Sequence, residues 1–535
     1  MKTIIIFIIS SLLFISNLFS QVTVQWIERY NGPGNISEFA YALAVDNEGN
    51  VYVTGESDGG PWEDYTTVKY NSNGALQWAV NFNGTANGLD SPEDIGFDNL
   101  GNVYVTGVSE GVGTNDDFAT VKYNSSGVQQ WVARYNGPGN NKDEPNALVI
   151  DGAGNVYVTG RSYGSGSNYD YATIKYNSNG DSVWVNRYNG SGNGSDGASS
   201  IAIDKDGNVY VTGNTDVSGT NNYDFATIKY NSNGTQLWAT TYGRTGNSYE
   251  SASAISVDDA SNVYVTGSSS GTGTGSDYAT IKYNPNGTQL WISIYNGPGS
   301  VSGREDNAYE LAIDNTGNVY VSGSSDSSGT NRDYATVKYN TDGIQQWVSR
   351  YNGPGNYEDF VGGLAIDGNG NVYVTGSSSG TGTGSDYATI KYNADGIQQW
   401  VERYNNGLTN FNDGASGVAV DDAGNVYVTG TSSGTGTGSD YITIKYSQTT
   451  GIQNISTEIP NGFSLSQNYP NPFNPVTNIE FSIPKQGNIK ITVYNSQGKE
   501  VLVLLNQRLT PGSYRTDFYA AVGVPKSLQK FLESR

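Results

Sequence analysis

The chain of 535 residues contains neither cysteine nor histidine, and these two absences exclude much of enzyme chemistry. Without cysteine there are no disulfides, thiolate nucleophiles or thiolate-bound metals. Without histidine the commonest general base and the commonest metal ligand are missing, so Ser-His-Asp triads and histidine zinc sites are excluded. Any catalysis must therefore use carboxylates, tyrosine, lysine or arginine.

Basic residues are scarce as well. Lys and Arg number 28 against 51 Asp and Glu, which gives a net charge of −23 and a pI of about 4.3. Nucleic-acid phosphates require a basic footprint, so we predict no nucleic-acid partner. An acidic surface of this kind favours solubility and contact with cations.

Long apolar runs are confined to the N-terminus. Lys2 is followed by an apolar stretch over residues 4–13 and by the small residue Ser20 before Gln21. This order predicts a secretory signal peptide over residues 1–20. The alternative is a retained membrane anchor, but several serines and Asn17 dilute the stretch. We expect an exported protein with no membrane span after cleavage.

The rest of the chain is dominated by one repeated segment, Gly-Asn-Val-Tyr-Val-Thr-Gly. With small variations it returns eight times at intervals of 52 to 56 residues. A fixed period of this length indicates a repeat protein. The copies begin at Gly49, Gly101, Gly154, Gly207, Ser261, Gly317, Gly370 and Gly424.

Each repeat is predicted to form four short strands. In the first copy, residues 40–45 and 51–54 alternate in the way typical of strands; in the fifth, residues 277–283 and a strand with Trp291 follow a Gly/Ser/Thr loop. β-Branched and aromatic residues suit half-buried strands, and the Gly, Asn and Asp clusters between them suit turns. The fold class is therefore all-β, and the architecture is a β-propeller of four-stranded blades.

The two ends of the repeat array predict how the propeller closes. A lone strand with Trp26 precedes the array over residues 22–30, whereas the eighth copy ends at Tyr446 without a Trp strand. Pairing of residues 22–30 with residues 442–446 would complete the eighth blade and cover both open edges. We predict eight blades closed by the N-terminal strand.

The repeat unit also carries a family resemblance. Ala-Val-Asp-x-x-Gly-Asn-Val-Tyr-Val-Thr-Gly, then Asp-Tyr-Ala-Thr-Ile-Lys-Tyr and a Gln-Trp or Leu-Trp strand, resembles the bacterial propeller repeat SBBP, a relative of the NHL type, over residues 22–446. The resemblance implies a propeller domain over residues 21–446 and a secreted location, with no shared catalytic activity. Its family name refers to seven blades, so seven and eight blades both remain open on this ground.

Two sets of acidic residues recur in every repeat and are predicted to gather on one face, which we call the carboxylate rim. They could attract Ca²⁺, or they could accept hydrogen bonds from loop N–H groups and pair with recurrent arginines. The first set, our candidate metal ligands, is Glu38, Asp90, Asp143, Asp196, Glu250, Asp306, Asp359 and Asp413. The second set is Asp64, Asp117, Asp170, Asp224, Asp277, Asp333, Asp386 and Asp440.

A few positions break the repeat symmetry, which an enzyme with a single substrate would require. They are residues 61–63, the extended loop over residues 301–306, and the inner-strand carboxylates Asp94 and Glu310. Two carboxylates could act as acid and base on a glycosidic bond. We expect Asp94 and Glu310 to lie too far apart for this, because their blades stand on opposite sides of the ring.

The C-terminal part has a different composition. A polar linker over residues 447–462 precedes a proline-rich segment and alternating strands over residues 479–483 and 489–494. This part resembles the sorting domain of type IX secretion cargo, which implies a small Ig-like β-sandwich over residues 463–520 and the type IX secretion machinery as a partner. The sorting motif consists of Asn468, Tyr469, Pro470, Asn471, Pro472, Phe473, Asn474 and Pro475.

The last residues, 521–535, depart from that resemblance. Such domains usually continue through a Gly-Val-Tyr strand, but this chain continues Ala-Val-Gly-Val-Pro-Lys. This ending indicates a frame-shifted or truncated terminus, or else a native variant. If the last strand is missing, the stability of the sandwich and its recognition by the secretion machinery are both affected.

Together these features predict a secreted or cell-surface protein of a Gram-negative bacterium. We expect a non-catalytic binding, adhesion or scaffold module without a cofactor other than Ca²⁺, and with a polysaccharide or a surface protein as its partner. Near-identical blades suit multivalent contact with a repetitive ligand. The alternative is a carbohydrate-active enzyme, a glycoside hydrolase or lyase, that uses carboxylates at the channel mouth.

Overall fold

Every element of the computed structural model is a β-strand within the residues that it describes, which are 4–7, 22–58, 62–219, 222–244, 249–271, 275–299, 305–327, 331–407, 412–434, 436–448, 452–469, 476–494 and 500–519. None of these segments forms a helix with the length and apolarity that a membrane crossing requires. The chain divides into two compact units, of which the larger holds residues 24–397 and 401–447.

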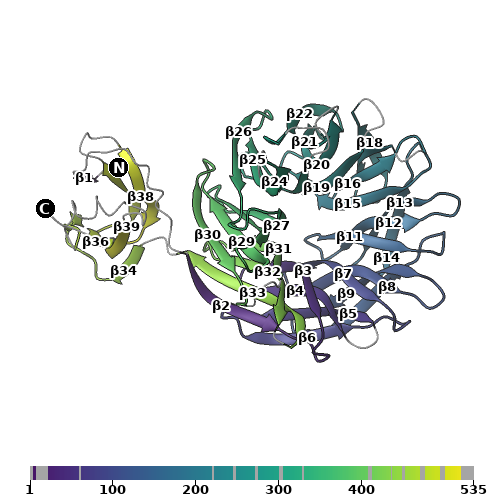
Figure 1. The fold of residues 1–535 in the computed structure, drawn as a ribbon, viewed down its shortest axis with the longest axis horizontal. Helices are drawn as coiled ribbons and strands as arrows, with labels where there is room; N and C mark the ends of the chain where they lie inside the picture. Colours follow the sequence, from purple (N-terminus) through teal and green to yellow (C-terminus); the bar gives the residue numbers. More distant parts are fainter. Residues whose placement is uncertain are drawn as a thin grey trace. The chain divides into compact units, whose positions relative to one another are not determined.

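The larger unit contains eight four-stranded sheets, which confirms the predicted propeller and its number of blades. Blade 1 consists of β3 (Glu38–Val45), β4 (Val51–Asp58), β5 (Glu63–Tyr70) and β6 (Leu76–Phe82), paired antiparallel in this order. The sheets surround a common centre, with β11, β15, β19 and β27 on the inner side (Figure 1).

The next six blades repeat the order of blade 1. Blade 2 consists of β7 (Asp90–Phe97), β8 (Val103–Glu110), β9 (Asp116–Tyr123) and β10 (Gln129–Tyr135), and blade 3 of β11 (Asp143–Ile150), β12 (Val156–Tyr163), β13 (Tyr169–Tyr176) and β14 (Ser182–Tyr188). Blade 4 consists of β15 (Asp196–Ile203), β16 (Val209–Asp216), β17 (Tyr223–Tyr230) and β18 (Gln236–Tyr242), and blade 5 of β19 (Glu250–Val257), β20 (Val263–Gly271), β21 (Gly275–Tyr283) and β22 (Gln289–Tyr295). Blade 6 consists of β23 (Asp306–Ile313), β24 (Val319–Asp326), β25 (Arg332–Tyr339) and β26 (Gln345–Tyr351), and blade 7 of β27 (Asp359–Ile366), β28 (Val372–Ser379), β29 (Ser385–Tyr392) and β30 (Gln398–Tyr404).

The eighth blade combines both ends of the propeller. Its sheet has the order β2 (Val22–Tyr30), β33 (Gly438–Gln448), β32 (Val426–Gly434) and β31 (Asp413–Val420). The ring of Tyr30 lies 5.7 Å from that of Tyr441 on β33. Blade 8 also contacts blade 1, because Ser416 Oγ donates a 2.7 Å hydrogen bond to the carbonyl oxygen of Ala40.

The Val-Tyr-Val segment of each second strand is the centre of the packing between blades. In blade 1, Tyr52 is fully buried, and its ring lies 6.2 Å from Trp78 and 5.9 Å from Phe97 of blade 2. Lys69 Nζ lies 4.9 Å from the centre of the same ring, within the range of a cation–π interaction. Recurrent tyrosines and tryptophans thus pack neighbouring sheets together.

The turn between the first two strands of each blade depends on its aspartate. Asp46 Oδ1 accepts hydrogen bonds from the N–H groups of Glu48 and Asn50, at 3.0 and 2.9 Å. Asp46 Oδ2 accepts one from Tyr52 Oη at 3.0 Å. The turn needs a positive φ, and Gly49 supplies it with a φ of 76°.

The C-terminal unit contains two sheets. The first has the order β34 (Ile452–Ser456), β39 (Gly512–Tyr519), β36 (Val476–Ile483) and β35 (Ser464–Leu465). The second has the order β1 (Ile4–Phe7), β37 (Gly487–Tyr494) and β38 (Glu500–Leu509). Phe481, Ile483 and Tyr514 of the first sheet share a core with Ile491 and Leu505 of the second.

Candidate functional site

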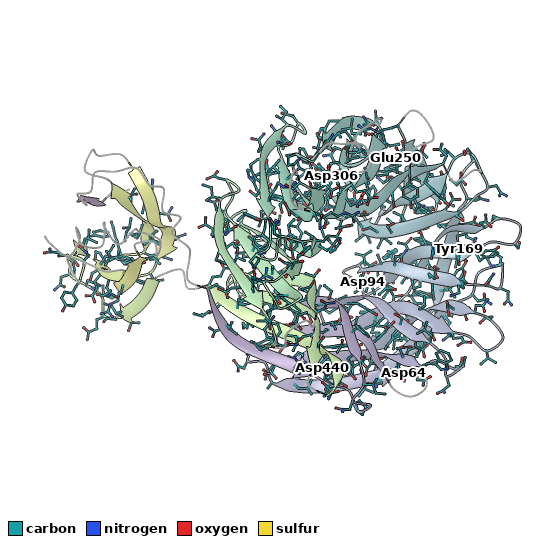
Figure 2. The ribbon with its side chains drawn as sticks, viewed as in Figure 1. Asp64, Asp94, Tyr169, Glu250, Asp306 and Asp440 are labelled. Carbon is teal, nitrogen blue, oxygen red and sulfur yellow. The ribbon has the colours of Figure 1, made fainter. Side chains whose placement is uncertain are left out.

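In each blade the two rim acids lie at the same end of the sheet, separated by a serine or threonine on the strand between them. In blade 1, Glu38 on β3 is the register partner of Ser57 on β4, and Ser57 is the partner of Asp64 on β5. Figure 2 shows Asp64, Glu250, Asp306 and Asp440 at different places around the ring. The corresponding rows are Asp90–Ser109–Asp117, Asp143–Ser162–Asp170, Asp196–Thr215–Asp224, Glu250–Ser269–Asp277, Asp306–Ser325–Asp333, Asp359–Ser378–Asp386 and Asp413–Ser432–Asp440.

The first set of rim acids holds the loops that connect consecutive blades. Asp143 Oδ2, for example, accepts a 2.6 Å hydrogen bond from the Gly137 N–H in the loop before β11. Asp90, Asp196, Asp306 and Asp359 accept the same bond from Gly84, Gly190, Gly297 and Gly353 at 2.6 to 2.7 Å. These aspartates therefore cap loops.

The second set of rim acids pairs mainly with arginines from the outer strands. In blade 3, Arg187 Nη2 lies 2.7 Å from Asp170 Oδ2 and 2.8 Å from the carbonyl oxygen of Ser162. Arg187 Nη1 donates to Ser162 Oγ and also, at 3.0 Å, to Tyr135 Oη of blade 2. The other pairs are Arg29–Asp440, Arg134–Asp117, Arg350–Asp333 and Arg403–Asp386.

Sequence reasoning missed one arginine of the rim. Arg244 follows β18 and reaches the next blade, where its Nη1 lies 2.8 Å from Asp277 Oδ2. Its place in a loop, outside the recurrent strand position, hides it from a comparison of repeats. The outer-strand position of blade 5 holds Ile294 instead of arginine, opposite Ala279.

Burial raises the pKa of most acids in the first set, because the charged form loses hydration. At Asp143 the hydrogen bonds from Gly137 and Ser162 oppose this rise, and the charge of Asp117 adds to it. At Glu38 burial raises the pKa to about 7, and the neighbouring Asp440 adds to the rise. Burial has the same effect at Asp90, Asp196, Asp306, Asp359 and Asp413.

The described residues contain no group of three or more acidic side chains arranged to hold a metal ion. Ca²⁺ binding by the full set of rim acids therefore stays a prediction. The contacts show that most of these acids cap loops or form ion pairs within the propeller.

The inner strands carry the symmetry-breaking carboxylates. Asp94 lies toward the centre of the ring (Figure 2), where it accepts 2.8 Å hydrogen bonds from the N–H groups of Ile95 and, in blade 3, Leu148. Burial raises the pKa of Asp94 to about 6 and that of Glu310 to about 7. The charge of Asp94 adds to the rise in the pKa of Glu310.

Further departures from the repeat lie in blades 1 and 2. Tyr41 Oη donates a 2.7 Å hydrogen bond to Glu56 Oε2, and the charge of Glu56 helps burial to raise the pKa of Glu93 to about 7. Trp62 is 55% exposed. Residue 61 and residues 301–304, which also break the repeat, lie outside the described residues.

The opposite face of the propeller has a cavity between blades 6 and 7. Its volume is about 450 Å³, and it lies between the turns that join the first two strands of these blades. We call it the turn-face cavity. Its lining includes Asp314, Asn315, Thr316, Tyr320, Lys338, Asp367, Asn369 and Ala394.

The predicted sorting motif lies mostly outside the described residues. Tyr469 is 79% exposed and bridges Asn478. Asn468 is described as well, but residues 470–475 are not. The atypical tail over residues 521–535 also lies outside the described residues.

Comparisons with known proteins agree with the two parts of the chain. The SBBP family of β-propeller repeats matches residues 25–61, 84–112, 130–166, 184–219, 291–329 and 346–382. A secretion system C-terminal sorting domain matches residues 467–517. No curated protein matches the chain.

Solved structures similar to this chain are found at low sequence identity. Sqt1 from Chaetomium thermophilum is 12% identical, with a TM-score of 0.48 over 79% of this chain and 98% of that chain. A protein of unknown function from Dyadobacter fermentans is 9% identical, with a TM-score of 0.39 over 80% and 99%. The polysaccharide lyase Uly1 is 10% identical, with a TM-score of 0.40 over 75% and 89%.

Proposed function

Because the chain is an SBBP-type β-propeller repeat protein with a type IX secretion sorting domain, which directs it to the surface or the exterior of a Gram-negative bacterium, we propose that it is a non-catalytic binding module. In this role its blades contact a repetitive polymer, with a polysaccharide as the favoured partner. Adhesion and scaffolding are the functions that such contacts serve.

The recurrence of the turn-face cavity's polar lining carries this proposal. The turn aspartate, the following asparagine, the tyrosine and the lysine return in all eight blades, as in Asp314, Asn318, Tyr320 and Lys338 of blade 6. Amide, carboxylate and phenol groups at a concave surface suit a hydroxylated ligand. Several equivalent sites on one rigid ring would bind a polymer far more tightly than its single units.

Binding of soluble polysaccharides and of their short oligosaccharides to the mature full-length chain tests the proposal. We expect measurable affinity for a polymer and much weaker affinity for its oligosaccharides. Asn315 is exposed on the cavity, so Asn315→Trp should block one site without unfolding the blade. This variant should lose only a small part of the polymer affinity, whereas complete loss would contradict binding spread over the blades.

A carbohydrate-active enzyme is the second candidate, and the inner-strand carboxylates that break the repeat, Asp94 and Glu310, favour it. Two carboxylates with raised pKa values of about 6 and about 7 can divide the roles of acid and base near neutral pH. Release of new chain ends from a polysaccharide is the measurement that decides. If the wild type has this activity and both Asp94→Asn and Glu310→Gln lose it, the protein is an enzyme and the binding proposal is wrong.

A further inference from the structure

The chain contains fifteen Asn–Gly bonds, a sequence that favours deamidation of the asparagine. In this reaction the glycine backbone nitrogen loses its proton and attacks Cγ of the asparagine side chain. The new C–N bond closes a succinimide ring, the side-chain nitrogen leaves as ammonia, and water then opens the ring to aspartate or isoaspartate. Glycine favours ring closure because it has no Cβ to restrict the backbone. The contacts of each glycine nitrogen decide which of the fifteen bonds can react.

Rim acids of the first set bind six of the fifteen glycine N–H groups. In the loop before β11, the Gly137 N–H donates to Asp143 Oδ2 at 2.6 Å, and the Asn136 side chain is held by Asn140 Oδ1 at 2.8 Å. A hydrogen bond to a charged acceptor is strong, and it holds both the nitrogen and its proton in place. The other five glycines bound in this way are Gly32, Gly84, Gly190, Gly297 and Gly353.

Six further glycine N–H groups are bound within turns and loops. The Gly74 N–H donates to the carbonyl oxygen of Asn71 at 2.9 Å, and the Gly407 N–H donates to Asn405 Oδ1 at 2.6 Å. The nitrogen that would attack the side chain is therefore engaged in twelve of the fifteen bonds. The other glycines that donate to turn carbonyl oxygens are Gly180, Gly234, Gly287 and Gly370.

The three remaining glycines have free N–H groups. Within the described residues, the N–H groups of Gly88, Gly194 and Gly462 donate to no hydrogen bond. The asparagines before them are exposed, so water reaches their side chains. They are Asn87, Asn193 and Asn461.

Two of these asparagines occupy a loop position that recurs in the propeller. Asn87 and Asn193 have φ values of 53° and 51°, and each Oδ1 accepts a hydrogen bond from the asparagine four residues earlier, at 2.9 and 2.7 Å. This bond polarises the side-chain carbonyl and makes Cγ more electrophilic. Asn140 has the same backbone, with a φ of 48°, and the same bond at 2.8 Å, but Asn141 follows it instead of glycine.

We propose that deamidation at the Asn–Gly bonds of this protein is confined to Asn87, Asn193 and Asn461. The rim acids of the first set protect the bonds whose glycines they hold. Each event replaces an amide by a carboxylate and so adds one negative charge to the chain. Isoaspartate also adds one carbon to the backbone, which disrupts the left-handed turn at residues 87 and 193. The modification therefore alters the loops that enter blades 2 and 4.

Peptide mapping by mass spectrometry, after incubation of the mature full-length chain at mildly alkaline pH, tests this inference. We expect the three bonds to react about tenfold faster than the other twelve, a factor that one strong hydrogen bond supplies. The control is the chain in denaturant, where these contacts are lost and all fifteen bonds should react at similar rates. Similar rates at all fifteen bonds of the folded chain would overturn the proposal.

Asp143→Ala removes the acceptor of the Gly137 N–H and tests the protection directly. Asn136 should then deamidate about tenfold faster than in the wild type, because the glycine nitrogen is released. Asn189 is the internal control, since its glycine keeps the bond to Asp196. An unchanged rate at Asn136, in a variant that keeps the melting temperature of the wild type, would overturn the protective role of the rim acids.

Asn141→Gly tests the free position and does not depend on the folding of Asp143→Ala. It gives Asn140 the glycine that follows Asn87 and Asn193, and the N–H of residue 141 donates to no hydrogen bond among the described residues. Asn140 should therefore become as reactive as Asn87, while Asn136 in the same loop stays protected. An Asn140 that remains unreacted in this variant would overturn the proposal, because a free glycine nitrogen would then not suffice.

Discussion

Blades 1 and 3 have the same strands and the same row of rim residues, yet they differ in the charge that neutralises the row. In blade 3, Arg187 contacts Ser162 and Asp170 directly. In blade 1 the same outer-strand position is Asn81, opposite Thr66, so the outer strand brings no arginine to this row. One residue in a repeat therefore decides whether the outer strand contributes an arginine to the buried row.

The difference also shows why near-identical repeats need not be functionally equivalent. The strands and turns of a blade are fixed by local patterns, which blades 1 and 3 share. The rim depends on contacts between strands and between blades, where one side chain changes the balance of charge. Substitutions at the rim and substitutions at the shared turns should therefore change the free energy of unfolding by different amounts.

The largest effect is expected from Arg187→Ala, which gives blade 3 the deficit of blade 1. Asp170 is buried and would lose its ion-pair partner, so the free energy of unfolding should fall by about 3 kcal/mol. Chemical denaturation of wild type and variant measures the difference.

The control is Arg161→Ala in the same blade. Arg161 pairs with Glu144, but its side chain is 48% exposed, and exposed ion pairs contribute at most about 1 kcal/mol. Equal losses in the two variants would show that the rim pairing has no special weight. In that case the difference between the rim rows of blades 1 and 3 would not affect the free energy of unfolding.

A smaller and equal effect is expected at the turns, which the two blades share. Asp46 in blade 1 and Asp151 in blade 3 accept the same hydrogen bonds from two backbone N–H groups and a tyrosine hydroxyl. Asp46→Ala and Asp151→Ala should each cost about 2 kcal/mol, because these donors lose their acceptor. Denaturation midpoints of the two variants should coincide, and a clear difference would show that the blades also differ outside the rim.

Much of this fold follows from the sequence, because its signals are local and repeated. The Asp-x-x-Gly-Asn turn and the Val-Tyr-Val strand recur in every copy, so the number of blades and the adjacency of the two acid sets follow from the alignment of repeats. The left-handed backbone of Gly49 is also encoded locally, since glycine adopts it at little cost.

The contacts between blades were harder to predict. Arg244 completes the row of blade 5 from a loop of blade 4, and no periodic signal marks that loop. The burial that raises the pKa values of Asp94 and Glu310 depends on how the inner strands pack, which repeat spacing does not give. The lack of an arginine at Asn81 likewise stands out only when an arginine at the same strand position, such as Arg187, is seen in contact with a serine.

The smallest effect is expected at Glu310, an inner-strand carboxylate of blade 6 that blades 1 and 3 lack. Blades 1 and 3 carry Ala42 and Ala147 where blade 6 carries Glu310, so only the latter titrates there. Burial and the charge of Asp94 raise the pKa of Glu310 from 4.5 to about 7. The folded state therefore binds this proton more tightly than the unfolded state, and the stabilisation is full below pH 4.5 and is lost as the pH rises through 7.

Glu310→Gln should make the decline in melting temperature between pH 5 and pH 8 shallower than in the wild type, while Ala147→Gln, a control at the same position of blade 3, should leave the slope unchanged. The shift should be modest, because Glu310 is only partly buried and water screens its charge. If Glu310→Gln and the wild type show the same slope, the rim acids alone account for the pH dependence, and the channel position of blade 6 is energetically equivalent to those of blades 1 and 3.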